Sequence, residues 1–494
     1  GAGTYEEGSQ VTLTATPSPG FRFLRWEEVG QEVSKDNPMT FTAERNRSLT
    51  AVFESMPTYT ISCSVSPVES GTVEGAGSYE EGSQVTLTAT PSPGFRFLRW
   101  EEGGQEVSTE NPCIFTATSD RELVACFVHA WQKAFGGTGE ERLYSVQQTS
   151  DGDYIMAGYT NSSTKGGYDA YLAKADPSGN IIWERTFGME GDDRAHSVQQ
   201  TLDGGYILAG YTNSFGAGGY DAYLVKTDDS GKLDWEKTFG EKKNDYAYSV
   251  RQTADKGYIL AGYTNSFGSG DNNVYLVKTD DSGKLDWEKT FGGTGEEAAY
   301  SVQQTSDEGY ILAGYTTSFG AGSYDAYLLK TDSSGNFQWD KVFGLDYYVE
   351  INHFVRQTMD GGYIVAGIMD ITDMGLNDAY LVKTDSSGNP QGQGIFNFSA
   401  DDVAATVQQT VDGGYIMAGY TNSFGAGGYD AYLVKTDSYL NSQWHKTFGG
   451  AGEEAAYSVQ QTTDGGYILA GYTTSSGAAG YDAYLVKTDP LGNI

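Results

Sequence analysis

The stretch "TTDGGYILAGYT" at residues 462–473 decides the fold, because near copies of it recur through the chain. The Tyr that opens its central apolar run recurs seven times, at spacings of 52, 52, 52, 53, 52 and 52 residues. These residues are Tyr154, Tyr206, Tyr258, Tyr310, Tyr363, Tyr415 and Tyr467. A fixed period of this length indicates a repeat architecture.

Each copy predicts four short strands. The segments run in the order "AYSVQQT", "YILAGYT", "YDAYLVKTD" and a last segment such as "WEKTF", with Asp-Gly or Ser-Gly turns between them. Runs rich in Val, Ile, Thr and Tyr that are bounded by such turns are typical of strands. Because four antiparallel strands repeated around an axis are the plan of a β-propeller, we predict an all-β chain with a seven-bladed propeller at residues 129–494.

The two ends of this region predict how the ring closes. The last copy stops at Ile494, before its final strand, while a spare segment "AWQKAF" begins at Ala130. Aligning Ile494 with Ile181 puts Ala130 next in phase, with no residue missing. We expect residues 130–135 to be the outer strand of the last blade, which would remove an open sheet edge.

A different repeat precedes the propeller region. Residues 1–28 return almost unchanged as residues 75–102, a period of 74. The strand-like lead-in "YTISCSVSPVESGTVE" at residues 59–74 precedes the second copy, and the first copy has no equivalent. We therefore predict two small β-rich modules, at 1–56 and 57–128, of which the first lacks its opening strand.

Both repeats resemble known families. The motifs "VTLTATP", "GFRFLRW", Asn-Pro and "LTAVF" resemble the divergent internalin-type B repeat, and "SDGDYIMAGYTNS", "YDAYLVKTD" and "GGTGEE" resemble the seven-bladed β-propeller repeat of secreted and surface proteins. The B-repeat resemblance implies an extracellular or cell-surface protein in which such modules often serve as spacers.

Two cysteines of the second module occupy equivalent apolar positions of the first. Cys113 and Cys126 correspond to Met39 and Val52, which lie symmetrically about a turn, so we expect the cysteines to face each other across a hairpin. The sequence leaves two interpretations open, a cross-strand disulfide in an oxidising compartment and a pair of buried thiols. Cys63 has no evident partner.

The charge of the chain excludes some partners. With 66 acidic and 31 basic residues, its formal net charge is −35, which would repel nucleic acid and anionic membrane surfaces. No apolar run approaches the roughly 18 residues that span a bilayer. We therefore expect neither nucleic-acid binding nor membrane insertion within this segment.

Acidic residues precede the first strand of every repeat. They are expected to gather on one face of the propeller, where carboxylates could hold a hard cation such as Ca²⁺. The alternative is that each carboxylate accepts backbone N–H groups of its own loop. The candidates are Glu140, Glu141, Asp192, Asp193, Asp245, Glu296, Glu297, Glu350, Asp401, Asp402, Glu453 and Glu454. We expect no required cofactor.

The same face should carry aromatic residues from the connections between the second and third strands. Rings flanked by amides and carboxylates suit sugars or a protein partner. The alternative is that the Phe rings pack beneath their own glycine-rich loops. The ligand-binding candidates are Phe215, Phe267, Phe319, Phe424, Tyr168, Tyr220, Tyr324, Tyr429 and Tyr481.

The sequence shows no obvious catalytic constellation. Its four histidines form no metal-ligand cluster and no recognisable triad spacing. We predict that the chain is not an enzyme, and that it works in adhesion or in binding of a surface glycan or protein. Two alternatives are a fibre or surface-layer subunit that assembles with copies of itself by strand donation, and a propeller glycan hydrolase or lyase.

Overall fold

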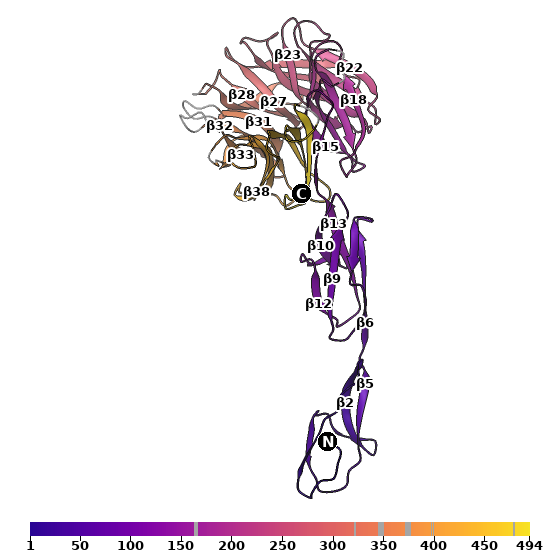
Figure 1. The fold of residues 1–494 in the computed structure, drawn as a ribbon. Helices are drawn as coiled ribbons and strands as arrows, with labels where there is room; N and C mark the ends of the chain where they lie inside the picture. The colour runs from indigo at the N-terminus through magenta and orange to yellow at the C-terminus, as the bar shows by residue number, and fades with distance from the viewer. Residues whose placement is uncertain are drawn as a thin grey trace. The chain divides into compact units, whose positions relative to one another are not determined.

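The computed structural model describes the chain apart from residues 163–165, 321–322, 344–349, 371–376, 397, 399 and 478–479 and the side chains of Glu350 and Asn352. Every helix or strand assigned in the described residues is a β-strand, so the prediction of an all-β chain is confirmed. The chain divides into two compact units, Gly1–Val128 and His129–Ile494 (Figure 1).

The N-terminal unit contains two related arrangements of strands. Its strands are β1 (Gln10–Leu13), β2 (Phe21–Glu28), β3 (Gln31–Ser34), β4 (Met39–Thr42), β5 (Leu49–Ser55), β6 (Thr58–Ser66), β7 (Gly71–Glu74), β8 (Gly77–Glu80), β9 (Gln84–Pro91), β10 (Phe95–Glu102), β11 (Gln105–Ser108), β12 (Cys113–Thr116) and β13 (Arg121–His129). The first repeat forms the sheets β1-β4 and β3-β2-β5, and the second forms β12-β9-β7 and β11-β10-β13-β6-β8. Each repeat buries one Trp in its core, Trp26 in the first and Trp100 in the second.

In the described residues the first repeat forms fewer strands than the second. In the second repeat β6 pairs with both β13 and β8. Residues 3–6 are equivalent to β8 in sequence, yet they form no strand. In the second repeat β8 pairs with β6, and the described residues before β1 contain no strand.

The hairpin that we predicted around Cys113 and Cys126 is wrong. β12, which carries Cys113, pairs with β9, whereas β13, which carries Cys126, pairs with β6. The two cysteines therefore belong to different sheets, and the facing pair on which the disulfide interpretation depended does not form. Cys63, Cys113 and Cys126 are free thiols, and Cys113 is buried in a core cluster that Cys63 also contacts.

The C-terminal unit is built from a repeated four-stranded sheet, as the sequence predicted. Its strands are β14 (Trp131–Phe135), β15 (Glu141–Gln148), β16 (Tyr154–Thr160), β17 (Asp169–Ala175), β18 (Ile181–Phe187), β19 (Asp193–Gln200), β20 (Tyr206–Thr212), β21 (Asp221–Thr227), β22 (Leu233–Phe239), β23 (Asp245–Gln252), β24 (Tyr258–Thr264), β25 (Asn273–Thr279), β26 (Leu285–Phe291), β27 (Glu297–Gln304), β28 (Tyr310–Thr316), β29 (Asp325–Thr331), β30 (Phe337–Phe343), β31 (Glu350–Gln357), β32 (Tyr363–Asp370), β33 (Asn377–Thr384), β34 (Pro390–Phe396), β35 (Asp402–Gln409), β36 (Tyr415–Thr421), β37 (Asp430–Thr436), β38 (Ser442–Phe448), β39 (Glu454–Gln461), β40 (Tyr467–Thr473) and β41 (Asp482–Thr488). In the described residues these strands form the sheets β15–β18, β19–β22, β23–β26, β27–β30, β31–β34, β35–β38 and β14-β41-β40-β39.

The two middle strands of each sheet are buried on both faces. In β16, Ile155 and Ala157 pack against Tyr206 and Leu208 of the next sheet, whereas Tyr154 packs in a cluster shared with the sheet of β39–β41. This explains why "YILAGYT" is an unbroken apolar run, because a strand with two buried faces needs no polar side.

Hydrogen bonds also join neighbouring sheets through their innermost strands. Ser145 Oγ accepts a bond from Val198 N at 3.1 Å. The same bond joins the last sheet to the first, where Val146 N donates to Ser458 Oγ at 3.1 Å. At its other side the last sheet includes β14, which pairs antiparallel with β41 so that Trp131 lies opposite Lys487.

A Trp on the outer strand of most sheets packs against a turn glycine of the next sheet. A Cβ on Gly179, whose φ is +75°, would lie 2.6 Å from the Trp131 ring. The same contact joins Trp183 to Gly231, Trp235 to Gly283, Trp287 to Gly335, Trp339 to Gly388 and Trp444 to Gly492. The exception is β34, where Gly392 takes the Trp position and the facing turn glycine is replaced by Leu440, which is buried at a φ of +68°.

Candidate functional site

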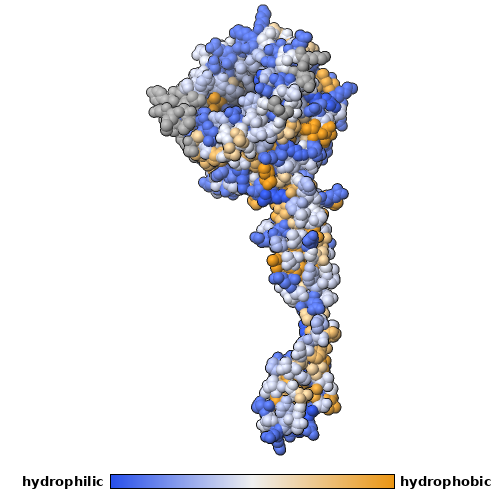
Figure 2. Space-filling view, in the orientation of Figure 1, coloured by the Kyte–Doolittle hydropathy of each residue, from blue (hydrophilic) through white to orange (hydrophobic). Residues whose placement is uncertain are grey.

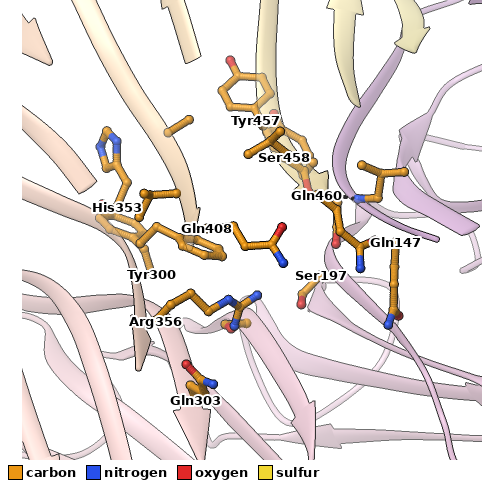
Figure 3. Close-up of a pocket in the computed structure, with 18 of the residues that line it drawn as sticks. Gln147, Ser197, Tyr300, Gln303, His353, Arg356, Gln408, Tyr457, Ser458 and Gln460 are labelled. Carbon is orange, nitrogen blue, oxygen red and sulfur yellow. Dashed lines mark hydrogen bonds between the residues drawn. The ribbon is translucent and has the colours of Figure 1, made fainter. Parts of the chain in front are cut away.

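The innermost strands of the sheets border a cavity of about 740 Å³, which we call the inner-strand cavity (Figure 3). Residues from β15, β19, β23, β27, β31, β35 and β39 line it. Each of these strands carries a register shift near its middle, for example between Leu143 and Ser145. Tyr144, Ser145, Val146 and Gln147 of β15 all line the cavity.

Aromatic rings form one layer of the wall. Tyr144 lies 4.9 Å from Tyr457 and 4.5 Å from His196, measured between ring centroids. The series continues from His196 to Tyr248, Tyr300 and His353 at centroid distances of 4.9, 5.2 and 5.9 Å. Ala405 occupies the equivalent position between His353 and Tyr457, so the aromatic layer has a gap there.

Glutamine side chains form a second layer and present N–H donors. Gln200 N donates to Gln147 Oε1 at 2.7 Å, and Gln461 N donates to Gln408 Oε1 at 2.8 Å. A backbone N–H only donates, so the atom that it meets must be the amide oxygen, and Nε2 remains available as a donor. The five glutamines held in this way are Gln147, Gln199, Gln303, Gln408 and Gln460.

Two arginines replace glutamine in this layer. Arg251 Nη1 donates to Val250 O at 2.8 Å, and the Arg356 guanidinium lies 4.6 Å from the centre of the Phe354 ring. Figure 3 shows Arg356 extending into the space bordered by Gln303 and Gln408. Both side chains keep some accessible surface because they border the cavity, although protein surrounds them. Burial lowers the pKa of Arg251 to about 10, and burial together with the charge of Arg251 lowers that of Arg356.

The other titratable groups of the wall are uncharged at neutral pH. Burial, with a contribution from Arg194, lowers the pKa of His196 to about 3. Burial also lowers the pKa of His353, whose Nδ1 lies 3.1 Å from Ala404 O. Burial raises the pKa of Tyr144 and Tyr248 above that of free tyrosine. No Asp or Glu is among the described residues that line the cavity.

The predicted acidic residues comprise five consecutive pairs and the single residues Asp245 and Glu350. The carboxylate that opens the first strand of a sheet, which we call the inner member, bonds to the loop before that strand wherever the structure describes it. Gly137 N donates to Glu141 Oε2 at 2.9 Å, and Gly293 N donates to Glu297 Oε2 at 2.9 Å. The carboxylates arranged in this way are Glu141, Asp193, Asp245, Glu297, Asp402 and Glu454, and all are buried. Where the structure describes side chains, no group of three or more His, Cys, Asp or Glu is arranged to hold a metal ion, and the Glu350 side chain lies outside that description.

The outer members of the pairs lie beside the predicted tyrosines. Tyr168 Oη donates to Glu140 Oε2 at 3.0 Å, and Tyr429 Oη donates to Asp401 Oδ2 at 3.1 Å. Tyr220 makes a longer contact of this kind with Asp192. Tyr324 packs on Tyr315, and Tyr481 packs on Tyr472 and the Arg142 guanidinium. Glu296 N and Glu453 N bond to Thr317 and Thr474 of neighbouring loops.

The four predicted phenylalanines are not equally exposed. Phe215 and Phe267 pack on Tyr223 and Tyr275 at the margin of the core. Phe424 contacts Phe398 and His445. Phe319 alone of the four is exposed, at 41%. The structure therefore does not bring these rings together as one aromatic surface.

The sequence interpretation overlooked the inner-strand cavity, although a signal for it is visible. Two of the seven "VQQT" motifs read "VRQT", at Arg251 and Arg356. The glutamine oxygens satisfy backbone N–H groups of the neighbouring sheet, which the arginines at the equivalent positions cannot do.

The family comparison identifies the N-terminal unit. Residues 1–57 and 61–130 match the divergent InlB B-repeat domain, so the predicted resemblance is confirmed for these residues. This domain is typical of surface proteins. No curated protein matches the chain.

Solved structures resemble the fold at low sequence identity. BamB from Moraxella catarrhalis is 12% identical with a TM-score of 0.36, over 81% of this chain and 93% of that one. Puromycin hydrolase is 12% identical with a TM-score of 0.43, over 69% and 51%. The polysaccharide lyase Uly1 is 10% identical with a TM-score of 0.45, over 70% and 90%. These likenesses concern the fold, which is propeller-like.

Our prediction that the chain is not an enzyme is contradicted, because a hydrolase and a lyase stand among these similar structures. Enzymes and non-enzymes share this fold, so the lack of a familiar catalytic spacing in the sequence does not separate the two classes. In the described part of the chain, no helix is long and apolar enough to cross a membrane.

Proposed function

We propose that His129–Ile494 is a closed seven-bladed β-propeller. Three observations support closure: β14 pairs with β41, Ser458 accepts a bond from Val146, and one core cluster contains residues of both the first and the last sheet. In this arrangement the inner-strand cavity lies along the propeller axis, where all sheets contribute to its wall.

We further propose that the propeller binds a small polar ligand, or the end of a glycan chain, in the inner-strand cavity. The observation that carries this proposal is a cavity of about 740 Å³ whose wall combines an aromatic layer with a layer of fixed N–H donors. Ligand sites have volumes of roughly 300–1,000 Å³ and combine apolar surface with a few placed polar groups. The surface of the whole chain is drawn in Figure 2. The B-repeat modules would carry this propeller at the cell surface, in adhesion or ligand capture.

The gap in the aromatic layer provides a test. Four of the seven equivalent positions carry Tyr, so Ala405→Tyr places a residue that the repeat already accommodates while narrowing the gap. We expect a ligand found by screening sugars, glycans and peptides against the full chain to bind Ala405→Tyr at least about tenfold more weakly. Phe319→Ser, on an exposed loop, is the matched control. Equal binding by the wild type and Ala405→Tyr, with loss in Phe319→Ser, would move the site to the loop face.

A second candidate function is assembly by strand donation. The sheet β3-β2-β5 ends at β5, whereas the equivalent strand β13 of the second repeat is followed by β6. An edge of unpaired backbone accepts a strand from another chain. Light scattering over a range of concentrations tests this, because a chain that assembles through β5 should return to monomer when Pro replaces Ala51 or Phe53.

A further inference from the structure

The inner-strand cavity contains two cations in a protein that is otherwise strongly acidic. Acidic residues outnumber basic ones by 66 to 31 over the chain. In the cavity the balance is reversed, because the described residues of its wall include Arg251 and Arg356 and no carboxylate. A buried charge without a partner is unfavourable, since it loses water and gains no counter-charge.

Neither arginine restores the bond that glutamine makes at the equivalent position. The five glutamines use Oε1 to accept a backbone N–H of the next sheet, and a guanidinium has no acceptor atom. Arg251 Nη1 bonds to Val250 O at 2.8 Å and lies 3.5 Å from Ser197 Oγ of the preceding sheet. Arg356 lies over Phe354 without donating a hydrogen bond to any residue that the structure describes. Each substitution therefore removes the bond that Oε1 accepts from the next sheet, and together the two arginines add like charges to the cavity wall.

The polar groups around the arginines are donors as well. The Nε2 atoms of Gln303 and Gln408 are available because the corresponding oxygens are already bonded. His196 and His353 are neutral at physiological pH, so the two arginines set the charge of the wall. A wall that offers fixed donors and positive charge complements a group that has only acceptors and carries negative charge.

We propose that the ligand of the inner-strand cavity carries an oxyanion group, a carboxylate or a phosphate, which Arg251 and Arg356 bind. This inference rests on the proposed function, ligand binding in the same cavity, and specifies the class of ligand. A guanidinium offers paired N–H groups that fit two oxygens of one oxyanion. The rest of the ligand would contact the aromatic layer through an apolar face, as a sugar ring does.

The repeat itself supplies the test variants. Arg251→Gln and Arg356→Gln introduce the residue found at the other five equivalent positions, so both variants and the double variant should fold. Arg185→Gln removes the same charge from an exposed position on β18 and is the matched control. The probes are D-glucuronate, D-glucose 6-phosphate, D-glucose and inorganic phosphate at one ionic strength, with binding measured by calorimetry and thermal shift on the full chain.

We expect the wild type to bind at least one of the three anions more than about tenfold more tightly than D-glucose. Each single variant should weaken anion binding about 10- to 100-fold, as expected for a charge-assisted bond. The double variant should lose the preference for anions, whereas Arg185→Gln should keep it. Without ligand, the double variant should melt at a higher temperature than the wild type, because the like charges are gone and the glutamine bonds return.

Several outcomes would overturn the inference. A wild type that shows no anion-dependent rise in melting temperature would do so, as would anion binding that persists in the double variant. If D-glucose or another neutral ligand binds the wild type at least as tightly as every anion does and fails to bind Ala405→Tyr, the proposed cavity function survives while the oxyanion inference fails. Response to D-glucuronate alone identifies a carboxylate ligand, and response to phosphate or to D-glucose 6-phosphate identifies a phosphate ligand.

Discussion

The contact between Trp131 and Gly179 allows the proposed closure of the propeller to be measured. Trp131 is 7% exposed, its Nε1 donates to Pro177 O at 3.0 Å, and its ring covers the turn of the next sheet at Gly179. Replacing a buried Trp by Ala costs about 3–5 kcal/mol, and glycine within a strand adds about 0.5–1 kcal/mol. Trp131→Gly should therefore lower the free energy of unfolding by about 3–6 kcal/mol if β14 is an integral strand.

Elsewhere in the chain the Trp and the turn glycine that it contacts are both replaced, which suggests the matching double variant. Gly392 and Leu440 occupy the positions equivalent to Trp131 and Gly179, with the left-handed backbone kept at Leu440. Gly179→Leu alone should destabilise, because its Cβ would lie 2.6 Å from the Trp131 ring. In the double variant the introduced leucine side chain replaces part of the lost ring, so the two changes should be coupled favourably by about 1–3 kcal/mol.

Urea unfolding would measure the loss in free energy of unfolding and the coupling between the two substitutions, and hydrogen exchange would report on β14 and β41. The matched cycle is Trp287→Gly with Gly335→Leu, in an interior sheet where the chain is continuous through all four strands. Similar couplings in the two cycles are expected. The reasoning is refuted if Trp131→Gly leaves stability and β41 exchange unchanged while Trp287→Gly lowers stability and speeds exchange of β25, since β14 would then contribute nothing to its sheet.

Three further predictions concern the loop face. Burial, with a contribution from Asp193, raises the pKa of Asp169 to about 6. Between about pH 4 and pH 6 the folded state therefore holds a proton that the unfolded state has lost. The stability of the folded state should fall as the pH rises through this range. Asp169→Asn, which copies Asn273 in the third sheet, should abolish this decline and raise the melting temperature at pH 7, and identical pH profiles would contradict the assignment. Because the inner carboxylates already accept protein hydrogen bonds, EDTA and excess Ca²⁺ should give the same melting curve, and a Ca²⁺-dependent rise would restore the cation interpretation. Phe424→Ser should lower the melting temperature because it removes packing on Phe398 and His445, whereas Phe319→Ser should leave it nearly unchanged; equal effects would mean that the two loops pack alike.

The sequence predicted the elements of the fold well and their partners less well. Strand positions follow from the period and from turns such as that at Gly179. The apolar run after Tyr154 correctly indicated a strand, and the structure shows that this strand is buried on both faces. The Cys113–Cys126 hairpin was wrong because two strands joined by a short turn need not pair, and here each finds its partner in a different sheet. The spacing and composition of residues 113–126 do not indicate which strands β12 and β13 pair with, because that depends on where β9 and β6 lie.

The candidate site was harder to predict for a local reason. Alternation along β15 assigns Tyr144 and Ser145 to opposite faces, yet both line the cavity, and the strand carries a register shift between Leu143 and Ser145. Such a shift has no sequence signature in "YSVQQ". The acidic pairs were visible in every copy, and the alternative that we had left open accounts for their inner members, which bond to their own loops.

Some departures from the repeat are compensated by a neighbouring substitution, and others are not. At β34 the Trp is lost, and Leu440 appears at the facing turn, so one change fills the space left by the other and the packing is maintained. That pair needs no function to explain it. At Arg251 and Arg356 the repeat also departs from its pattern, but no carboxylate in the described cavity wall neutralises the added charge, and each change removes an acceptor that the neighbouring sheet uses elsewhere. We infer that a partner from outside the chain compensates this departure, and a negatively charged group fits the two arginines.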